Sequence, residues 1–137
     1  MPPTLPSVVQ PANADPTVKE IFKRIEDTLQ IKQGEIYLAD LNPIKGHEQG
    51  GFRPVLVLQN NILNKHLNTV IIAPITSNLK AKGLLTTYFL TQDKLQKESI
   101  VLLHQIRTLD KTRLKNRISS LSSYELAGIR EQLSLIF

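Results

Sequence analysis

GHEQGGFRPVLVLQNN, residues 46–61, joins a polar turn to a short apolar strand. The run Val55–Leu58 is apolar and flanked by turn-forming residues, so it predicts a buried β-strand. The turn before it carries histidine, glutamate, glutamine and arginine side chains. Two glycines allow a sharp turn just before Arg53, and Pro54 fixes the backbone just after it. The stretch therefore predicts a strand with a functional turn at its mouth.

Further short strands are predicted on both sides of this stretch. Residues 35–41 (EIYLADL) alternate between two faces, and apolar runs recur downstream at 69–75, 86–91, 99–106 and 117–121. Residues 60–66 are long enough for one helical turn. Many short strands separated by turns are typical of a small β-barrel. We therefore predict a mainly β fold for this part of the chain.

A helix is predicted at the end of the sequence, over residues 122–137. Ser122, with Glu125 three residues later, forms a capping-box pattern. Apolar residues then recur at helical spacing: Leu126, Ile129, Leu133 and Ile136. Such a stripe is the face that a surface helix buries. The predicted barrel is thus completed by a C-terminal helix.

The beginning of the chain has a different character. Five of the eight prolines lie in the first sixteen residues, so residues 1–15 predict a flexible proline-rich tail. Residues 16–30 predict an amphipathic helix, which Asp15 or Thr17 can cap, and Thr17 with Glu20 makes a capping-box pattern. Its apolar stripe is Val18, Ile21, Phe22, Ile25 and Leu29. The stripe can bury on the barrel, on a partner or over a groove, and we expect an added layer on the barrel or on a dimer interface. The main domain is then residues 33–137.

Composition and charge exclude several classes of site. The 137 residues contain no cysteine, which excludes disulfides and thiolate metal ligands and fits a cytoplasmic location. No apolar run approaches the ~20 residues of a membrane span. The formal charge is +5, and five bases fall between residues 107 and 117. Such a stretch suits a polyanion such as nucleic acid or is a solvated surface, and charge alone does not decide between them.

Common motifs of metal and nucleotide chemistry are absent from the sequence. The three histidines are far apart, and there is no HExxH, GxxxxGK[ST] or GxSxG pattern. We therefore expect no metal and no cofactor. Arginine, histidine and hydroxyl side chains suffice for RNA cleavage, because the ribose 2′-hydroxyl itself attacks the phosphate. An arginine fork suits the developing charge, since it binds two phosphate oxygens at once.

Four ordered blocks of this sequence resemble the MazF/PemK (Kid) toxins. They are GEIYLADLNPIKGHEQGGFRPVLVLQN (34–60), VIIAPITSN (70–78), SIVLLHQIRTLDKTRL (99–114) and RISSLS (117–122), followed by the final helix. The resemblance implies an SH3-like small β-barrel, here with an extra N-terminal helix, and usually a homodimer. It implies a sequence-specific, metal-independent endoribonuclease toxin of a type II toxin–antitoxin system that cleaves single-stranded RNA. A MazE/PemI-like antitoxin would neutralise it by placing its C-terminal segment in the RNA groove.

The resemblance also implies site residues. The arginine of the GxRP turn, regarded as catalytic in the family, matches Arg53, and its companion threonine matches Thr76. The histidine of the GHEQ segment matches His47, which is a third catalytic candidate. The RNA-binding candidates, including two loop lysines that can follow phosphates or form a solvated surface, are Glu48, Gln49, Ser77, Asn78, Lys80, Lys82, Gln105, Arg107 and Asp110.

Proton transfer is assigned on physical grounds. Because arginine has a pKa above ~12, we assign Arg53 to stabilising phosphate charge, and His47 or an ionised carboxylate is the easier base. His104 stands where many family members have an acidic residue. It lies in a predicted apolar strand, which favours a core or groove histidine.

Two other functions remain open at this point. One is a non-enzymatic gyrase inhibitor of the same fold, like the CcdB toxins. The other is an inactive family member that only binds an antitoxin. The presence of both Arg53 and Thr76 argues against each of them.

Overall fold

The computed structural model describes residues 17–21, 30–43, 46–48 and 50–137, and the chain divides into two units, Met1–Gln30 and Ile31–Phe137. In the first unit, residues 18–21 are helical, and the Glu20 amide donates to Thr17 Oγ1 at 3.1 Å. This is the capping contact predicted for Thr17. The predicted tail, residues 1–15, and residues 22–29 of the predicted helix lie outside the described residues.

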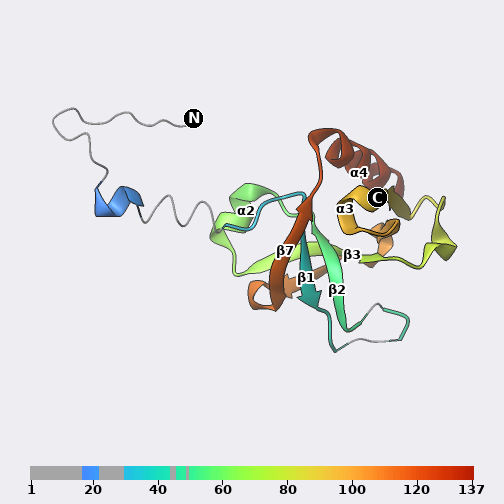
Figure 1. Cartoon of the computed structure of the whole chain (residues 1–137), viewed down its shortest axis with the longest axis horizontal. Helices are drawn as coiled ribbons and strands as arrows, with labels where there is room; N and C mark the ends of the chain where they lie inside the picture. Colours follow the sequence, from blue (N-terminus) through green and yellow to red (C-terminus); the bar gives the residue numbers. More distant parts are fainter. Residues whose placement is uncertain (1–16, 22–29, 44–45, 49) are drawn as a thin grey trace. The chain divides into compact units, whose positions relative to one another are not determined.

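Seven antiparallel strands form one sheet in the second unit. They are β1 (Glu35–Asp40), β2 (Phe52–Val57), β3 (Thr69–Thr76), β4 (Thr87–Leu90), β5 (Ser99–Leu102), β6 (Arg107–Asp110) and β7 (Leu114–Ser120). Their order is β4-β5-β3-β2-β1-β7, and β6 also pairs with β3. In Figure 1, β7, β1 and β2 lie side by side. Within the described residues the strand order does not close from β7 back to β4, so the small barrel is open.

Both faces of the central strands are buried. Successive side chains of a strand point to opposite faces, and β2 follows this rule: Leu56 joins one core, whereas Val55 and Val57 join the other. The first core also holds Ile36, Ala73, Ile75, Leu90, Val101, Leu103, Leu121 and Ile129. The second also holds Tyr37, Ala39, Leu41, Val70, Ile72 and Leu109. The strands thus surround the second core, and the first core lies between the sheet and the C-terminal helix.

The helix α4 (Ser123–Ile136) is the predicted C-terminal helix, and it lies beside the short helix α3 (Gln92–Leu95) in Figure 1. The Ser122 hydroxyl accepts from the Glu125 amide, and the Glu125 carboxylate accepts from the Ser122 amide. The predicted capping box is therefore confirmed. Ile129 is buried in the first core, and the rest of the predicted stripe packs against it. The predicted mainly β fold with a C-terminal helix is also confirmed.

The remaining elements are short. They are α2 (Asn61–His66) and the 3-10 helices η3 (Leu79–Ala81), η4 (Leu103–Gln105) and η5 (Lys111–Arg113). The helical turn predicted for residues 60–66 is α2, which the Asn60 side chain caps. The strand predicted for residues 99–106 ends at Leu102, and η4 begins at Leu103. No helix in the described part of the chain is long and apolar enough to cross a membrane.

Candidate active site

A cleft of about 590 Å³ opens at the ends of β2 and β3, and Arg53, Thr76 and Ser77 line it. The strand register explains why the first two meet. Val55 pairs with Pro74 at this end of the two antiparallel strands. Arg53 lies two residues before Val55 and Thr76 lies two residues after Pro74, so both come to the cleft just beyond this pair. The structure thus brings together the two residues that the resemblance pairs as catalytic.

Arg53 is half-buried and is held by the turn that precedes it. Its Nε donates a hydrogen bond to the Gly50 carbonyl at 2.8 Å. Gly51 has a φ of +75°, which favours glycine and lets the chain turn back toward the arginine. Within the described residues, the terminal nitrogens of the guanidinium have no hydrogen-bond partner. They are therefore available to an anion in the cleft.

Thr76 is buried, and its Oγ1 accepts a hydrogen bond from the Asn78 amide at 3.1 Å. Closing a turn in this way is a common role of hydroxyls at strand ends. A hydroxyl is also a donor, so the Thr76 proton remains free for a phosphate oxygen. Asn78 caps η3, since its Oδ1 accepts from the Lys80 amide at 3.1 Å. The loop after β3 therefore has a fixed conformation that places Ser77 in the cleft.

A second, smaller cavity of about 180 Å³ gathers other predicted residues. Glu48, Gln105 and Arg107 line it together with His104. Arg107 Nη1 also donates to the Leu41 carbonyl at 3.1 Å. The strand predicted at His104 is wrong, because His104 lies in η4 and is exposed at the edge of this cavity rather than buried in a core.

Four other candidates lie outside both cavities: His47, Lys80, Lys82 and Asn78, which caps η3. His47 is exposed on the turn before β2, and Lys80 is exposed in η3. Lys82 Nζ lies 4.0 Å from the centre of the Phe89 ring, so a cation–π contact holds this lysine. Gln49 lies outside the described residues.

Asp110 is far from the cleft. It pairs with Thr69 at the start of β3, and a strand rise of about 3.3 Å per residue puts it roughly 23 Å from Thr76. Its Oδ1 caps η5 by accepting from the amide and hydroxyl of Thr112 at 2.9 and 2.7 Å. The hydrogen bond from the Thr112 hydroxyl, and to a smaller extent the one from its amide, lowers the pKa of Asp110. Its contacts within this chain are those of a helix cap.

All five bases between residues 107 and 117 bind oxygen atoms of the chain itself. The contacts are Arg107 with the Leu41 carbonyl, Lys111 with that of Asn64, Arg113 with that of Asn42, Lys115 with that of Thr112, and Arg117 with the Glu35 carboxylate. These side chains hold loops and strands in place. The basic stretch is therefore mainly structural, and its charge does not by itself indicate a nucleic-acid surface.

The Arg117 contact belongs to a buried polar group. Glu35 is buried; its Oε2 lies 3.1 Å from Arg117 Nη1, and its Oε1 accepts from the Tyr37 hydroxyl at 2.9 Å. Burial, and to a smaller extent the contact with this carboxylate, raises the pKa of Tyr37 above its ordinary value. The charge of Glu35 is thus satisfied beside the second core.

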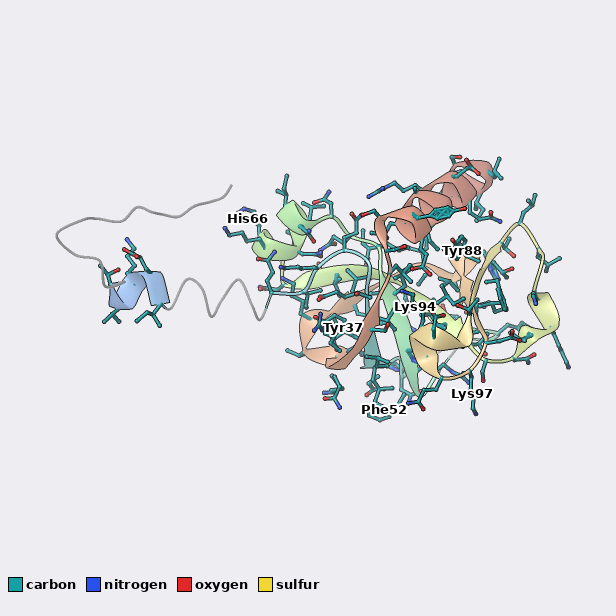
Figure 2. All side chains as sticks on the ribbon, turned by 45° about the horizontal axis from the view of Figure 1, so that its top comes forward. Tyr37, Phe52, His66, Tyr88, Lys94 and Lys97 are labelled. Carbon is teal, nitrogen blue, oxygen red and sulfur yellow. The ribbon has the colours of Figure 1, made fainter. Side chains whose placement is uncertain are left out.

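One wall of the main cleft is formed by residues that the sequence did not predict. The helix α3 and the turn after it contribute Lys94, Gln96 and Lys97, while Phe52 and Ile118 line the cleft from the strands. Figure 2 shows Phe52, Lys94 and Lys97 on this part of the domain. No sequence signal marked these residues, because α3 has only four residues and no apolar run.

Lys94 joins α3 to its neighbours. Its Nζ lies 3.1 Å from Glu125 Oε1 and donates to the Ser120 carbonyl at 3.1 Å. Burial alone would raise the pKa of Glu125, but hydrogen bonds from Ser122 and Lys94 lower it. The described residues contain no group of three acidic or histidine side chains that could hold a metal ion.

Comparison with known proteins shows which family the chain belongs to. Residues 32–137 match the family described as PemK-like, MazF-like toxin of type II toxin-antitoxin system. The chain belongs to this family. The endoribonuclease MazF of Staphylococcus epidermidis is 43% identical over 107 residues, which are 77% of this chain and 89% of that protein.

Solved MazF structures have the same fold. The MazF of Deinococcus radiodurans matches with a TM-score of 0.68 and 29% identity, over 78% of this chain and 96% of that chain. A MazE–MazF complex of the same organism matches with a TM-score of 0.60 and 28% identity, over 77% of this chain and 94% of that chain. The predicted MazF/PemK-type barrel is therefore confirmed. This MazF-like chain is an endoribonuclease toxin, and neither the gyrase-inhibitor nor the inactive alternative is favoured.

Proposed function

We propose that this MazF-like toxin cleaves single-stranded RNA at specific sequences, without a metal ion, in the cleft of Arg53 and Thr76. The ribose 2′-hydroxyl attacks the adjacent phosphorus, and the bond from phosphorus to the 5′-oxygen of the next nucleotide breaks. The chain then needs to supply only charge stabilisation, proton transfer and orientation. The meeting of Arg53 and Thr76 in one cleft carries this proposal.

Arg53 and Thr76 have complementary roles in this mechanism. The terminal nitrogens of Arg53 bind the two non-bridging phosphoryl oxygens, where charge develops in the transition state. The Thr76 hydroxyl donates to one of the same oxygens. Neither group is a good base, so the 2′-hydroxyl proton goes to His47 or to the carboxylate of Glu48 on the neighbouring turn.

The smaller cavity extends the RNA site. Glu48, His104, Gln105 and Arg107 offer both donors and acceptors there, which is the chemistry that reads the edges of an unpaired base. Ser77 continues the main cleft, and Lys80 is close to it in sequence. Asp110 and Lys82 do not enter the proposal, since each is held by a contact elsewhere in the chain.

The partners are proposed from the relatives. Because a MazE–MazF complex is among the matched structures, we propose a MazE/PemI-like antitoxin and a homodimeric toxin. A substrate of cellular RNA implies that the protein acts in the cytoplasm.

We predict that the purified protein cuts a long RNA at defined sites, mapped by primer extension, equally well with and without EDTA. Arg53→Ala should lower the cleavage rate by roughly 100-fold or more, because one charge-stabilising donor contributes that much. Arg130→Ala, at an exposed arginine of α4, is the matched control and should cleave like the wild type. Loss of cleavage in EDTA, or full activity of Arg53→Ala with its thermal unfolding unchanged, would contradict the proposal.

A further inference from the structure

The main cleft continues from Arg53 to a part that the mechanism above does not use. Phe52 lines this part and is 61% exposed. Ile118 of β7 also lines it and is 43% exposed. An aromatic ring that stands open to solvent inside a cleft is a surface on which a planar group can stack.

Lys97 provides a charge in the same cleft. It is exposed, and within the described residues its ammonium has no hydrogen-bond or ion-pair partner. Lys94 differs, because its charge is paired with Glu125. The backbone at Lys97 is fixed, since the buried Ser99 donates from its hydroxyl to the Lys97 carbonyl at 3.1 Å. The free ammonium is therefore presented by an ordered turn.

The charges of the cleft favour an anion. Among the described residues of the cleft, Arg53 and Lys97 are the cations without an acidic partner, and they stand on different elements, β2 and the α3–β5 turn. Asp93 is the acidic residue of the lining, and its carboxylate accepts a hydrogen bond from the Thr91 hydroxyl. Two cations with an aromatic ring in the same cleft match a strand that alternates phosphates and bases.

We propose that this part of the cleft is a second nucleotide site, in which Phe52 stacks the base next to the scissile bond and Lys97 binds a neighbouring phosphate. The inference rests on the proposed RNA cleavage and deepens it. The cleft of about 590 Å³ lies within the roughly 300–1,000 Å³ typical of ligand sites. It therefore has room for a nucleotide beside the phosphate at Arg53. Stacking tolerates any base, so this site raises affinity rather than selecting sequence.

The phosphate contact is tested by the salt dependence of binding. The probe is an oligoribonucleotide that spans a mapped cleavage site and carries a 2′-O-methyl ribose there, which has no hydroxyl to attack. The slope of log affinity against log salt is negative, and for Lys97→Gln it should become less steep by about 0.7, the value for one phosphate contact on a single strand. Lys65→Gln, at an exposed lysine of α2 outside both cavities, should keep the wild-type slope.

The stacking contact is tested by replacing the ring. Phe52→Leu should bind the probe roughly tenfold more weakly, whereas Phe52→Tyr keeps a ring and should bind within about twofold of the wild type. Tyr124→Leu, at an aromatic residue of α4 that is 79% exposed, should have no effect. In cleavage assays the Phe52→Leu loss should appear in KM rather than in kcat.

The outcomes separate the two proposals. If the wild type cleaves RNA but Lys97→Gln keeps the full slope or Phe52→Leu keeps full affinity, the second site is wrong and the catalytic assignment stands. If the wild type neither binds the probe nor cleaves RNA, the proposed function itself is wrong.

Discussion

Gln96 has a φ of +68° and follows directly after α3, in the position where glycine usually ends a helix. The left-handed conformation destabilises a residue with a side chain by about 1–2 kcal/mol. Glycine avoids this cost, but its greater freedom in the unfolded chain lowers the stability by about 0.5–1 kcal/mol. We predict that Gln96→Gly raises the free energy of unfolding by about 0.5–1 kcal/mol, measured by urea denaturation. Gln96→Ala keeps the strained φ and should gain nothing. An equal gain in both variants would contradict the assignment of strain.

Single residues differ in how far the sequence can predict them. Arg53 and Thr76 could be predicted as site residues, because each lies at the end of a predictable strand in a short motif that resembles the family's. Lys97 could not, because only tertiary contacts decide whether a lysine is paired. Lys94, three residues earlier, is bound to Glu125, and nothing in the sequence separates the two. For the same reason the sequence could not decide the role of the five bases at 107–117, four of which bind backbone carbonyls of the chain while Arg117 binds the Glu35 carboxylate.

The ion pair of Lys94 and Glu125 joins the elements α3 and α4. Since the pKa of Glu125 is lowered from its ordinary 4.5, its ionised form stabilises the fold above that pH, and this stabilisation is lost as the pH falls through the lower, folded-state pKa. We predict that Glu125→Gln, which keeps the capping hydrogen bond, lowers the free energy of unfolding at neutral pH by about 0.5–1 kcal/mol.

Denaturant titrations across a range of pH check this prediction. The difference between wild type and Glu125→Gln should shrink steadily as the pH falls below 4.5. Glu131→Gln, on an exposed part of the same helix, should differ little from the wild type at any pH. A Glu125→Gln difference that stays constant from neutral to acid pH would show that the charge is not its cause.

Helices and strands differ in the same way: some form from local sequence patterns, and others form because of contacts with distant residues. The apolar runs of β2 and β3 and the capped stripe of α4 are local patterns, so the sequence predicts them. β6 and α3 have four residues each, too few to show a period, and they form because of neighbours: β6 along the first half of β3, and α3 through Lys94. Of these two elements, α3 forms the wall of the cleft that the sequence did not predict.

At the scale of the whole molecule, the domain that carries the site is self-sufficient. Among the described residues, both cores are built from Ile31 onward, and Ile31 itself packs on the second. The family match begins at residue 32. A chain of this length with its own two-sided core is expected to fold as a unit. The extension before it therefore adds to a domain that already holds the candidate cleft.

We predict that removing residues 1–30 leaves a cooperatively folding, RNA-cleaving domain whose Tm is several degrees lower. The described part of the extension carries Val18 and Ile21, which are 67% and 44% exposed and begin the predicted apolar stripe. Burying one such side chain in an added layer contributes about 1.5–3 kcal/mol, and each kcal/mol shifts the Tm of a domain of this size by roughly 4 °C. Calorimetry of both chains measures the difference.

Point substitutions show whether the stripe itself is the cause. Val18→Asp with Ile21→Asp in the full chain should lower the Tm as much as the deletion does, because charges cannot be buried there. Lys19→Asp, on an exposed residue between them, should leave it unchanged. An unaltered Tm after deletion would rule out the added layer. If RNA cleavage rose at the same time, a lid over the cleft would be the better account of the extension.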